Sequence, residues 1–134
     1  MRLLLGVLVV GAALACSVGP RPDKIQPARE PAGATIELQL RTGRPRHIVT
    51  GELLAVQDSG LLLRDTASIL LVPDRAMRNG TLLARGVGVT FAGRPAGAIR
   101  ERLRLLSRYP GGVSADLLSR LLVAYGRDSV ETVH

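Results

Sequence analysis

The stretch Thr35-Ile36-Glu37-Leu38-Gln39-Leu40-Arg41 decides the fold class of this chain. Its apolar residues alternate with polar ones, and a period of two is typical of a β-strand with one buried face. Similar apolar segments follow at residues 47–56, 61–65 and 69–72. The connections between them are short and rich in turn-forming residues, as in Asp58-Ser59-Gly60. Short strands joined by tight turns predict an antiparallel meander.

The segment after the last of these strands gives the meander a resemblance to known small barrels. A proline ends that strand, and Asp74-Arg75-Ala76-Met77 then offers one turn of 3₁₀ helix. We also expect Gly51 to mark a bend or bulge in the second strand. This order of strands, bend and 3₁₀ turn resembles SH3-like and Sm-like β-barrels. The resemblance implies a barrel over residues 35–92, closed by a strand at Leu82-Leu83 or at residues 87–91. The RNA-contact motifs of Sm-like proteins cannot be placed here, so we expect no nucleic-acid partner.

Residues 93–134 change from strand to helical periodicity. An amphipathic helix is predicted over residues 96–108, and the breaker Tyr109-Pro110-Gly111-Gly112 follows it. A second helix is predicted between the N-cap Ser114 and Gly126, with a polar tail and at most one more turn beyond it. We expect the two helices to pack on each other and on the barrel. The predicted fold class is therefore α+β: a small antiparallel SH3-like or Sm-like β-barrel followed by a C-terminal helical hairpin.

The first residues of the chain have the composition of an export signal. Arg2 precedes an apolar run that ends in small residues before Cys16. This run is too short to span a bilayer, since a spanning helix needs about 20 apolar residues. The ending Ala13-Leu14-Ala15-Cys16 resembles the bacterial lipobox, with alanine where leucine is usual. The resemblance implies that residues 1–15 are a lipoprotein signal peptide and that Cys16 is the lipid attachment site. Cleavage without acylation, which would release a soluble periplasmic protein, is the alternative.

The residues after the predicted cleavage site indicate where the protein works. In familiar diderm lipoproteins, an aspartate directly after the lipidated cysteine resembles an inner-membrane sorting signal. This chain has Ser17 at that position, so we expect an anchor in the outer membrane with the protein facing the periplasm. Residues 16–34 are rich in proline and poor in apolar side chains, which predicts a flexible tether. Cys16 is the only cysteine, so its acylation leaves none for a disulfide or a thiolate metal site.

The chemistry-bearing residues do not form a recognisable catalytic pattern. The two histidines, His47 and His134, have no second ligand at metal-binding spacing, so we expect no metal and no cofactor. Asp58, Ser59 and Asp65 are explained by turn formation. Aromatic residues make up 2% of the chain, too few for the stacking platforms of base- or sugar-binding proteins. We therefore expect a non-enzymatic protein without catalytic residues.

Basic residues are the most suggestive surface feature of a chain with a formal net charge of +7. Arg41, Arg44, Arg46 and His47 lie at the tip of the first predicted hairpin, where they would contact an anionic ligand or a partner. A solvated face without a ligand is the alternative. The function favoured by these patterns is a membrane-anchored envelope lipoprotein that acts as a binding or assembly module for another envelope protein. The second hypothesis is a barrel that recognises peptidoglycan or anionic lipid headgroups through the Arg41 to His47 hairpin.

Overall fold

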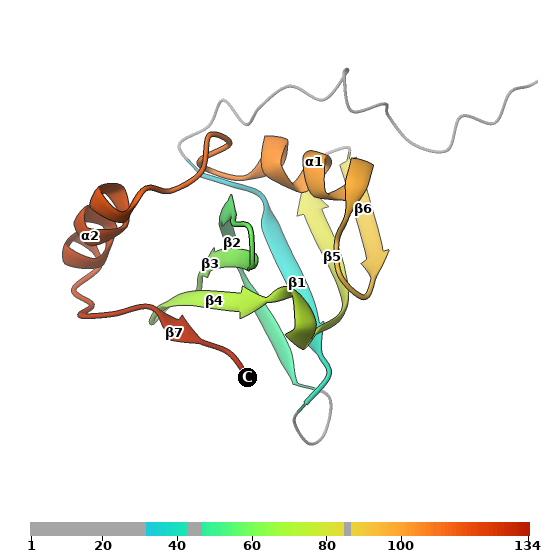
Figure 1. Ribbon diagram of the computed structural model, residues 1–134, viewed down its shortest axis with the longest axis horizontal. Helices are drawn as coiled ribbons and strands as arrows, with labels where there is room; N and C mark the ends of the chain where they lie inside the picture. The colour runs from blue at the N-terminus through green and yellow to red at the C-terminus, as the bar shows by residue number, and fades with distance from the viewer. Residues whose placement is uncertain (1–31, 43–46, 85–86) are drawn as a thin grey trace, which may run out of the picture.

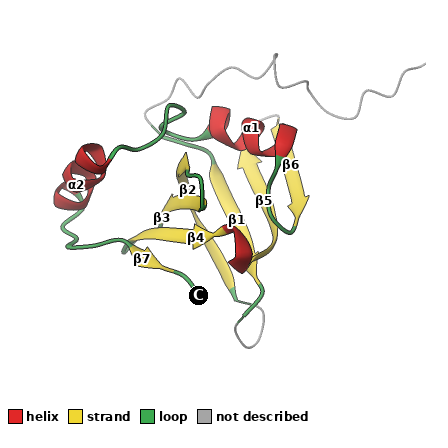
Figure 2. Cartoon of the chain, in the orientation of Figure 1, coloured by secondary structure: helices red, strands yellow, loops and turns green. Residues whose placement is uncertain are grey.

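The computed structural model describes residues 32–42, 47–84 and 87–134. Within these ranges the chain has an α+β fold, with a mostly antiparallel seven-stranded sheet and two α-helices (Figures 1 and 2). Neither described helix is long and apolar enough to cross a membrane. The predicted signal peptide and the attachment residue Cys16 lie outside the described residues, as does most of the predicted tether. The elements are β1 (Thr35–Leu40), β2 (Ile48–Val56), β3 (Gly60–Arg64), β4 (Ile69–Pro73), the 3₁₀ helix η2 (Asp74–Ala76), β5 (Met77–Ala84), β6 (Val87–Ala92), α1 (Gly97–Leu106), α2 (Ala115–Ala124) and β7 (Glu131–Thr132).

The strand order is β6-β5-β1-β2-β3-β4-β7, and every pair is antiparallel except β4 with β7. The four-strand meander β1 to β4 is confirmed, and so is the 3₁₀ turn before β5. Both segments considered for the closing strand are in the sheet, β5 beside β1 and β6 beside β5. Among the described residues the sheet does not close on itself, because β6 and β7 are its two edges. The predicted barrel, whose closure the sequence does not decide, is therefore not confirmed.

β1 is an interior strand of the sheet and shows the burial that its alternation predicts. Ile36, Leu38 and Leu40 are buried, while Thr35 and Glu37 are exposed. Its two neighbours, β2 and β5, satisfy its backbone hydrogen-bonding groups on both sides. Apolar burial on one face of this interior strand contributes Ile36, Leu38 and Leu40 to the main core.

The pairing of β2 is irregular, but the irregularity does not lie at Gly51, where a bend or bulge is expected from the sequence. The pairing of β2 with β3 shifts register between Leu53 and Ala55. Gly51 instead serves a close approach, since a Cβ atom there would lie 2.7 Å from the carbonyl oxygen of Arg64. A glycine in a strand signals a bulge or a close backbone contact equally well. The sequence alone does not separate the two.

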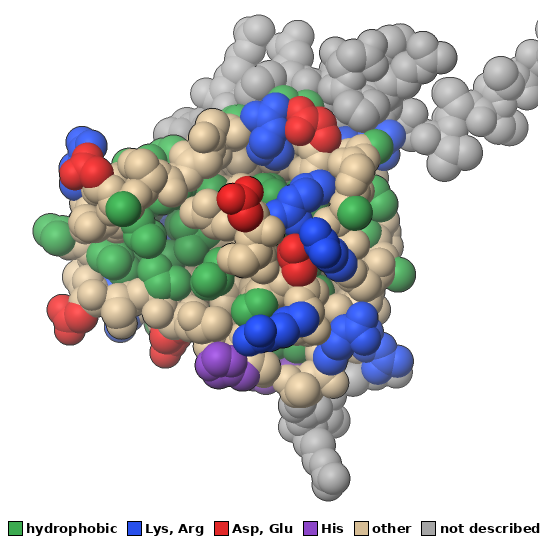
Figure 3. Space-filling model, viewed as in Figure 1, with side chains coloured by type: hydrophobic (Ala, Val, Ile, Leu, Met, Phe, Trp, Pro, Cys, Tyr) green, Lys and Arg blue, Asp and Glu red, His purple; other side chains and the backbone are tan. Residues whose placement is uncertain are grey.

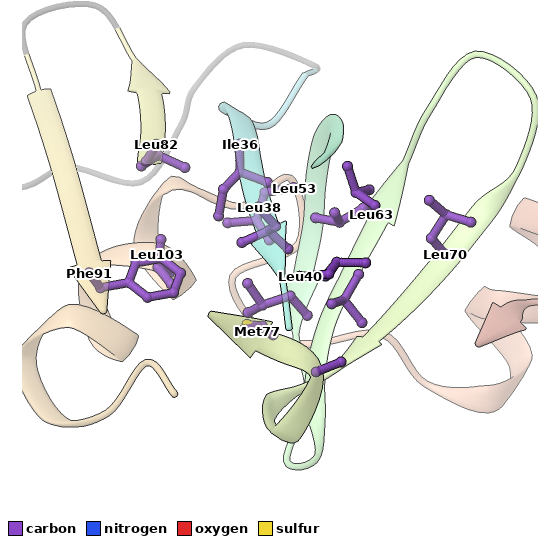
Figure 4. Packing of buried hydrophobic residues seen from close by; sticks show 14 of the residues in the cluster. Ile36, Leu38, Leu40, Leu53, Leu63, Leu70, Met77, Leu82, Phe91 and Leu103 are labelled. Carbon is purple, nitrogen blue, oxygen red and sulfur yellow. The ribbon is translucent and has the colours of Figure 1, made fainter. Parts of the chain in front are cut away.

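Two hydrophobic clusters hold the molecule together, and each helix belongs to a different one. Leu103 and Leu106 of α1 lie in the larger cluster with the buried side chains of β1 and β6, and Figure 4 shows Leu103 pointing toward Phe91. Leu121 of α2 lies in the smaller cluster with Leu54 and its neighbours. Figure 1 shows the two helices well apart. The predicted helical hairpin is therefore wrong.

The segment between the helices explains this separation. The backbone N–H of Arg108 donates to the carbonyl of Leu53 at 2.9 Å, and that of Tyr109 donates to Leu54 at 2.8 Å. The linker is thus bonded to β2 immediately after α1 ends, and the chain continues toward the smaller cluster. Helical periodicity predicts which face of each helix is apolar, but it does not predict which part of the sheet that face packs against.

The C-terminal tail forms a strand instead of the additional helical turn considered from sequence. β7 runs parallel to β4, and the N–H of Val133 donates to the carbonyl of Leu71 at 3.0 Å. The hydroxyl of Thr42 donates to the carbonyl of His134 at 2.7 Å. A strand of two residues carries no readable period, so the sequence offers no signal for it.

The N-cap predicted for α2 is confirmed, and it provides a first test. The Ser114 hydroxyl accepts from the N–H of Leu117 at 3.2 Å. We expect Ser114→Ala to lower the free energy of unfolding by about 1 kcal/mol, because an N-terminal donor loses its partner. The control is Ser119→Ala in the same helix, whose hydroxyl only donates back to the Ala115 carbonyl. Urea denaturation that gives equal losses for both variants would contradict the capping role.

Candidate functional site

The structure separates the two described members of the predicted basic cluster. Arg41 and His47 flank the tip of the β1–β2 hairpin but line different hollows. Arg44 and Arg46 lie outside the described residues. His47 belongs to a hollow of about 620 Å³ that also contains Asp65 and Glu131. Among the described residues no three His, Cys, Asp or Glu side chains are grouped as metal ligands would be.

Arg41 lines a larger hollow, which we call the arginine hollow. It is an open depression of about 760 Å³ at the end of the sheet where η2 lies. Three basic residues and one acidic residue contribute to it, together with two hydroxyl-bearing and two apolar residues. Its lining residues are Arg41, Ser59, Leu71, Pro73, Asp74, Arg75, Arg94 and Thr132.

Backbone hydrogen bonds bring these distant segments together. The N–H of Arg41 donates to the carbonyl of Ala76 at 2.9 Å, which ties the end of β1 to η2. The N–H of Asp74 donates to the Ser59 carbonyl at 2.9 Å, which ties η2 to the β2–β3 hairpin. Gly93 has a φ of 67°, a left-handed conformation suited to glycine. Its N–H donates to the carbonyl of Arg78 at 2.7 Å, and this bond positions the loop that carries Arg94.

Asp74 organises the charges on one side of the hollow. Its side chain is 13% exposed and lies 3.3 Å from both Arg94 Nε and Arg100 Nη1. Arg100 also donates to the carbonyl of Gln57, which fixes its guanidinium between two acceptors. The Arg94 side chain remains 71% exposed at the rim. Asp74 therefore restrains the arginines without covering the hollow.

The other two arginines of the hollow come from different elements. The Nε of Arg41 donates to the carbonyl of Met77 at 3.0 Å, which leaves the terminal guanidinium nitrogens for other contacts. Arg75 is exposed on η2. With Arg41, Arg75 and Arg94 counted against Asp74, the lining carries three positive charges and one negative charge, a net +2. Figure 3 shows basic side chains gathered on this face with acidic ones between them.

Two of the three arginines of α1, Arg100 and Arg104, are engaged in ion pairs, and so is Arg108 in the segment after it. Among the described residues the third, Arg102, has no ion-pair partner, and its buried Nε has no hydrogen-bond partner. Arg104 lies 2.6 Å from Glu101, and this hydrogen bond lowers the pKa of Glu101. Arg108 contacts Glu52 at 3.4 Å. Burial would lower the pKa of Arg108, but attraction to Glu52 and to the two neighbouring tyrosines outweighs it, and the pKa is raised. These pairs give the paired arginines structural roles.

Arg75 and Arg94 are the site residues that sequence reasoning missed. They are separated along the chain from each other and from Arg41, and they meet through the β1–β5 and β5–β6 pairings. Pro73 before η2 and Gly93 before Arg94 indicate turns, but a turn does not reveal which other turn it faces. Comparisons of the chain with protein-family models, with curated proteins and with solved structures find no match.

Proposed function

We propose that this chain is a membrane-anchored lipoprotein of the bacterial cell envelope that acts as a non-enzymatic binding or assembly module. The observation that carries the proposal is the arginine hollow. Three arginines from separate elements line one open depression. The Nε of Arg41 donates to the Met77 carbonyl and Arg94 pairs with Asp74, while Arg75 is exposed on η2. A charged surface of this kind suits recognition of a partner.

The sequence of the first residues supports the location. The apolar run before Cys16 and the lipobox-like Ala13-Leu14-Ala15-Cys16 favour diacylation of that cysteine. Ser17 favours the outer membrane, with the domain facing the periplasm. Residues 16–34 would then tether the described domain to the bilayer. The partner favoured by this arrangement is another envelope protein.

The strand order also supports a finer assignment of the fold. Strands β5, β1, β2, β3 and β4 are adjacent in that order, and η2 stands between β4 and β5. We propose that these five strands are an SH3-like or Sm-like unit to which β6 and β7 add at either edge. The sheet would then remain open because β6 and β7 occupy the two edges of this five-strand unit.

A second candidate function is recognition of peptidoglycan or of anionic lipid headgroups. The hypothesis from sequence placed this activity on the hairpin from Arg41 to His47. The observation that favours it is that Arg41 lines the arginine hollow beside Arg75 and Arg94. The two functions differ in the chemistry of what is bound.

Replacement of Cys16 tests the anchoring. We expect the membrane-extracted protein to have the mass of a chain cleaved before Cys16 plus acyl chains. Cys16→Ala is expected to lose the acyl mass and to leave the membrane fraction, because a thiol is the attachment point. Intact-mass spectrometry and cell fractionation measure both effects. An unmodified full-length chain in the cytosol would overturn the proposal.

Co-purification separates the two functions. If the module binds an envelope protein, we expect a defined protein to remain bound after the cell wall is digested with a muramidase. Loss of every bound protein after digestion would instead favour recognition of peptidoglycan. An Arg75→Glu variant purified in parallel shows whether the hollow takes part, since this exposed residue has no role in the core.

A further inference from the structure

The arginine hollow has a charge and a donor set that indicate a particular ligand chemistry. Its lining carries a net +2, from three guanidinium groups and one carboxylate. A carboxylate ligand would leave half of this charge unbalanced. A phosphate monoester, with about −1.5 to −2 charges at neutral pH, balances it.

The shape of the donor groups agrees with the charge. Guanidinium groups present planar pairs of N–H donors that match phosphate oxygens, and they are less strongly hydrated than ammonium groups. Ser59 and Thr132, whose side chains carry hydroxyl groups, belong to the same lining. Leu71 and Pro73 supply apolar surface beside them, which would face the uncharged part of a ligand.

Asp74 contributes as a positioning residue and not as a ligand contact. Its carboxylate would repel an anion, but it is 13% exposed and already shared between Arg94 and Arg100. It therefore holds the guanidinium of Arg94 at the rim before a ligand arrives. Preorganisation of this kind lowers the entropy cost of binding.

We propose that the arginine hollow binds a terminal phosphate group through Arg41, Arg75 and Arg94. The inference deepens the ligand-recognition function and does not require that Cys16 be acylated. The hollow lies at the C-terminal end of β1, opposite the end at which the described residues begin. A chain of the length between Cys16 and Gly33 spans at most about 60 Å, so either a lipid headgroup or a free phosphate ligand is within its range.

The test uses the full chain with Cys16→Ala as the common background, so that acylation does not drive membrane association. Calorimetric titration with inorganic phosphate, whose charge near neutral pH is close to that of a monoester, measures the free phosphate ligand. Sedimentation with phosphatidylcholine vesicles, with and without phosphatidic acid, measures the headgroup. We expect Arg75→Glu to weaken binding at least tenfold, because it replaces an attraction by a repulsion in the hollow. The matched control is Arg127→Glu, the same charge change at an exposed position beyond α2.

Each outcome decides the proposal. Loss of binding in Arg75→Glu with full binding in Arg127→Glu supports it. Binding of inorganic phosphate alone then assigns a free phosphate ligand, and retention on phosphatidic acid vesicles assigns a headgroup. Equal losses in the two variants would reduce the effect to net charge and overturn the site. Absence of binding in both assays by the background protein would also overturn it, whatever fractionation shows about Cys16.

Discussion

Gly60→Ala is expected to lower the free energy of unfolding by about 3 kcal/mol or more. Gly60 begins β3 and pairs with Pro73 of β4. A Cβ atom on Gly60 would lie 2.2 Å from the carbonyl oxygen of Val72 and 2.9 Å from the Cα of Pro73. Both neighbours are backbone atoms, so no change of side-chain rotamer relieves the overlap. The β3–β4 pair must separate, and with it the connection to η2.

Gly88→Ala is the matched control for this substitution. Gly88 also lies in a strand, β6, but a Cβ atom there meets nothing within 4 Å. We expect its unfolding free energy to change by no more than about 0.5 kcal/mol, since an open strand position tolerates a methyl group. Urea denaturation followed by circular dichroism measures both midpoints, with an unchanged m-value required for the comparison. Similar midpoints for the two variants would contradict the close approach at Gly60.

The order of the first four strands is predictable because each has its own local signal. Ile36, Leu38 and Leu40 alternate with polar residues, and Asp58-Ser59-Gly60 marks the hairpin between β2 and β3. The 3₁₀ turn after Pro73 also has a local signal, because proline ends the strand. Local chemistry is enough wherever neighbours in sequence are neighbours in space.

The rest of the fold depends on contacts between segments far apart in sequence. The parallel pairing of β7 with β4 joins residues around 131 to residues around 70, and neither segment indicates the other. The separate placement of α1 and α2 depends on the backbone bonds from residues 108 and 109 to β2. Backbone bonds of this kind involve groups that every residue carries, so side-chain patterns do not predict them.

The candidate site was predictable to the same limited extent. Arg41 was identified because it lies beside other basic residues in the chain, and the structure places it in the arginine hollow. Arg75 and Arg94 each stand in a turn that has its own structural explanation. Their meeting with Arg41 is a property of the sheet order, in which β5 lies between β1 and β6.

Glu52 is the centre of the most buried charge network among the described residues. Its carboxylate is 9% exposed and accepts from the N–H of Gly33 at 2.8 Å. It also pairs with Arg64 at 3.0 Å and with Arg108 at 3.4 Å. The guanidinium of Arg64 lies 5.0 Å from the centroid of the Tyr125 ring, which extends the network to the end of α2. Glu52 thus joins the start of the domain, β3 and the segment between the helices.

Glu52→Gln is expected to lower the free energy of unfolding by about 2 kcal/mol. Removing one partner of a fully buried ion pair costs about 3 to 5 kcal/mol because the other charge is left unpaired. Here the two arginines are 40% and 28% exposed, so water compensates part of that loss. The glutamine oxygen still accepts from Gly33, but an NH2 donor replaces the oxygen that accepts from Arg64, so the change removes that hydrogen bond together with the charge. The control is Glu37→Gln on exposed β1 surface, for which we expect a change within about 0.5 kcal/mol.

A double-mutant cycle assigns the loss to a specific pair. If Glu52 and Arg108 interact as the structure places them, Glu52→Gln and Arg108→Gln together should cost less than the sum of the single changes, by about 1 kcal/mol. The coupling should persist in added salt, because a pair with a carboxylate this buried is screened less than an exposed one. Additive losses, or a coupling that salt removes, would mean that Arg108 is solvated and that Glu52 acts through Arg64 and Gly33 alone. The segment between the helices would then be held to β2 by its backbone bonds without help from this charge, and the separation of α1 from α2 would not depend on Glu52.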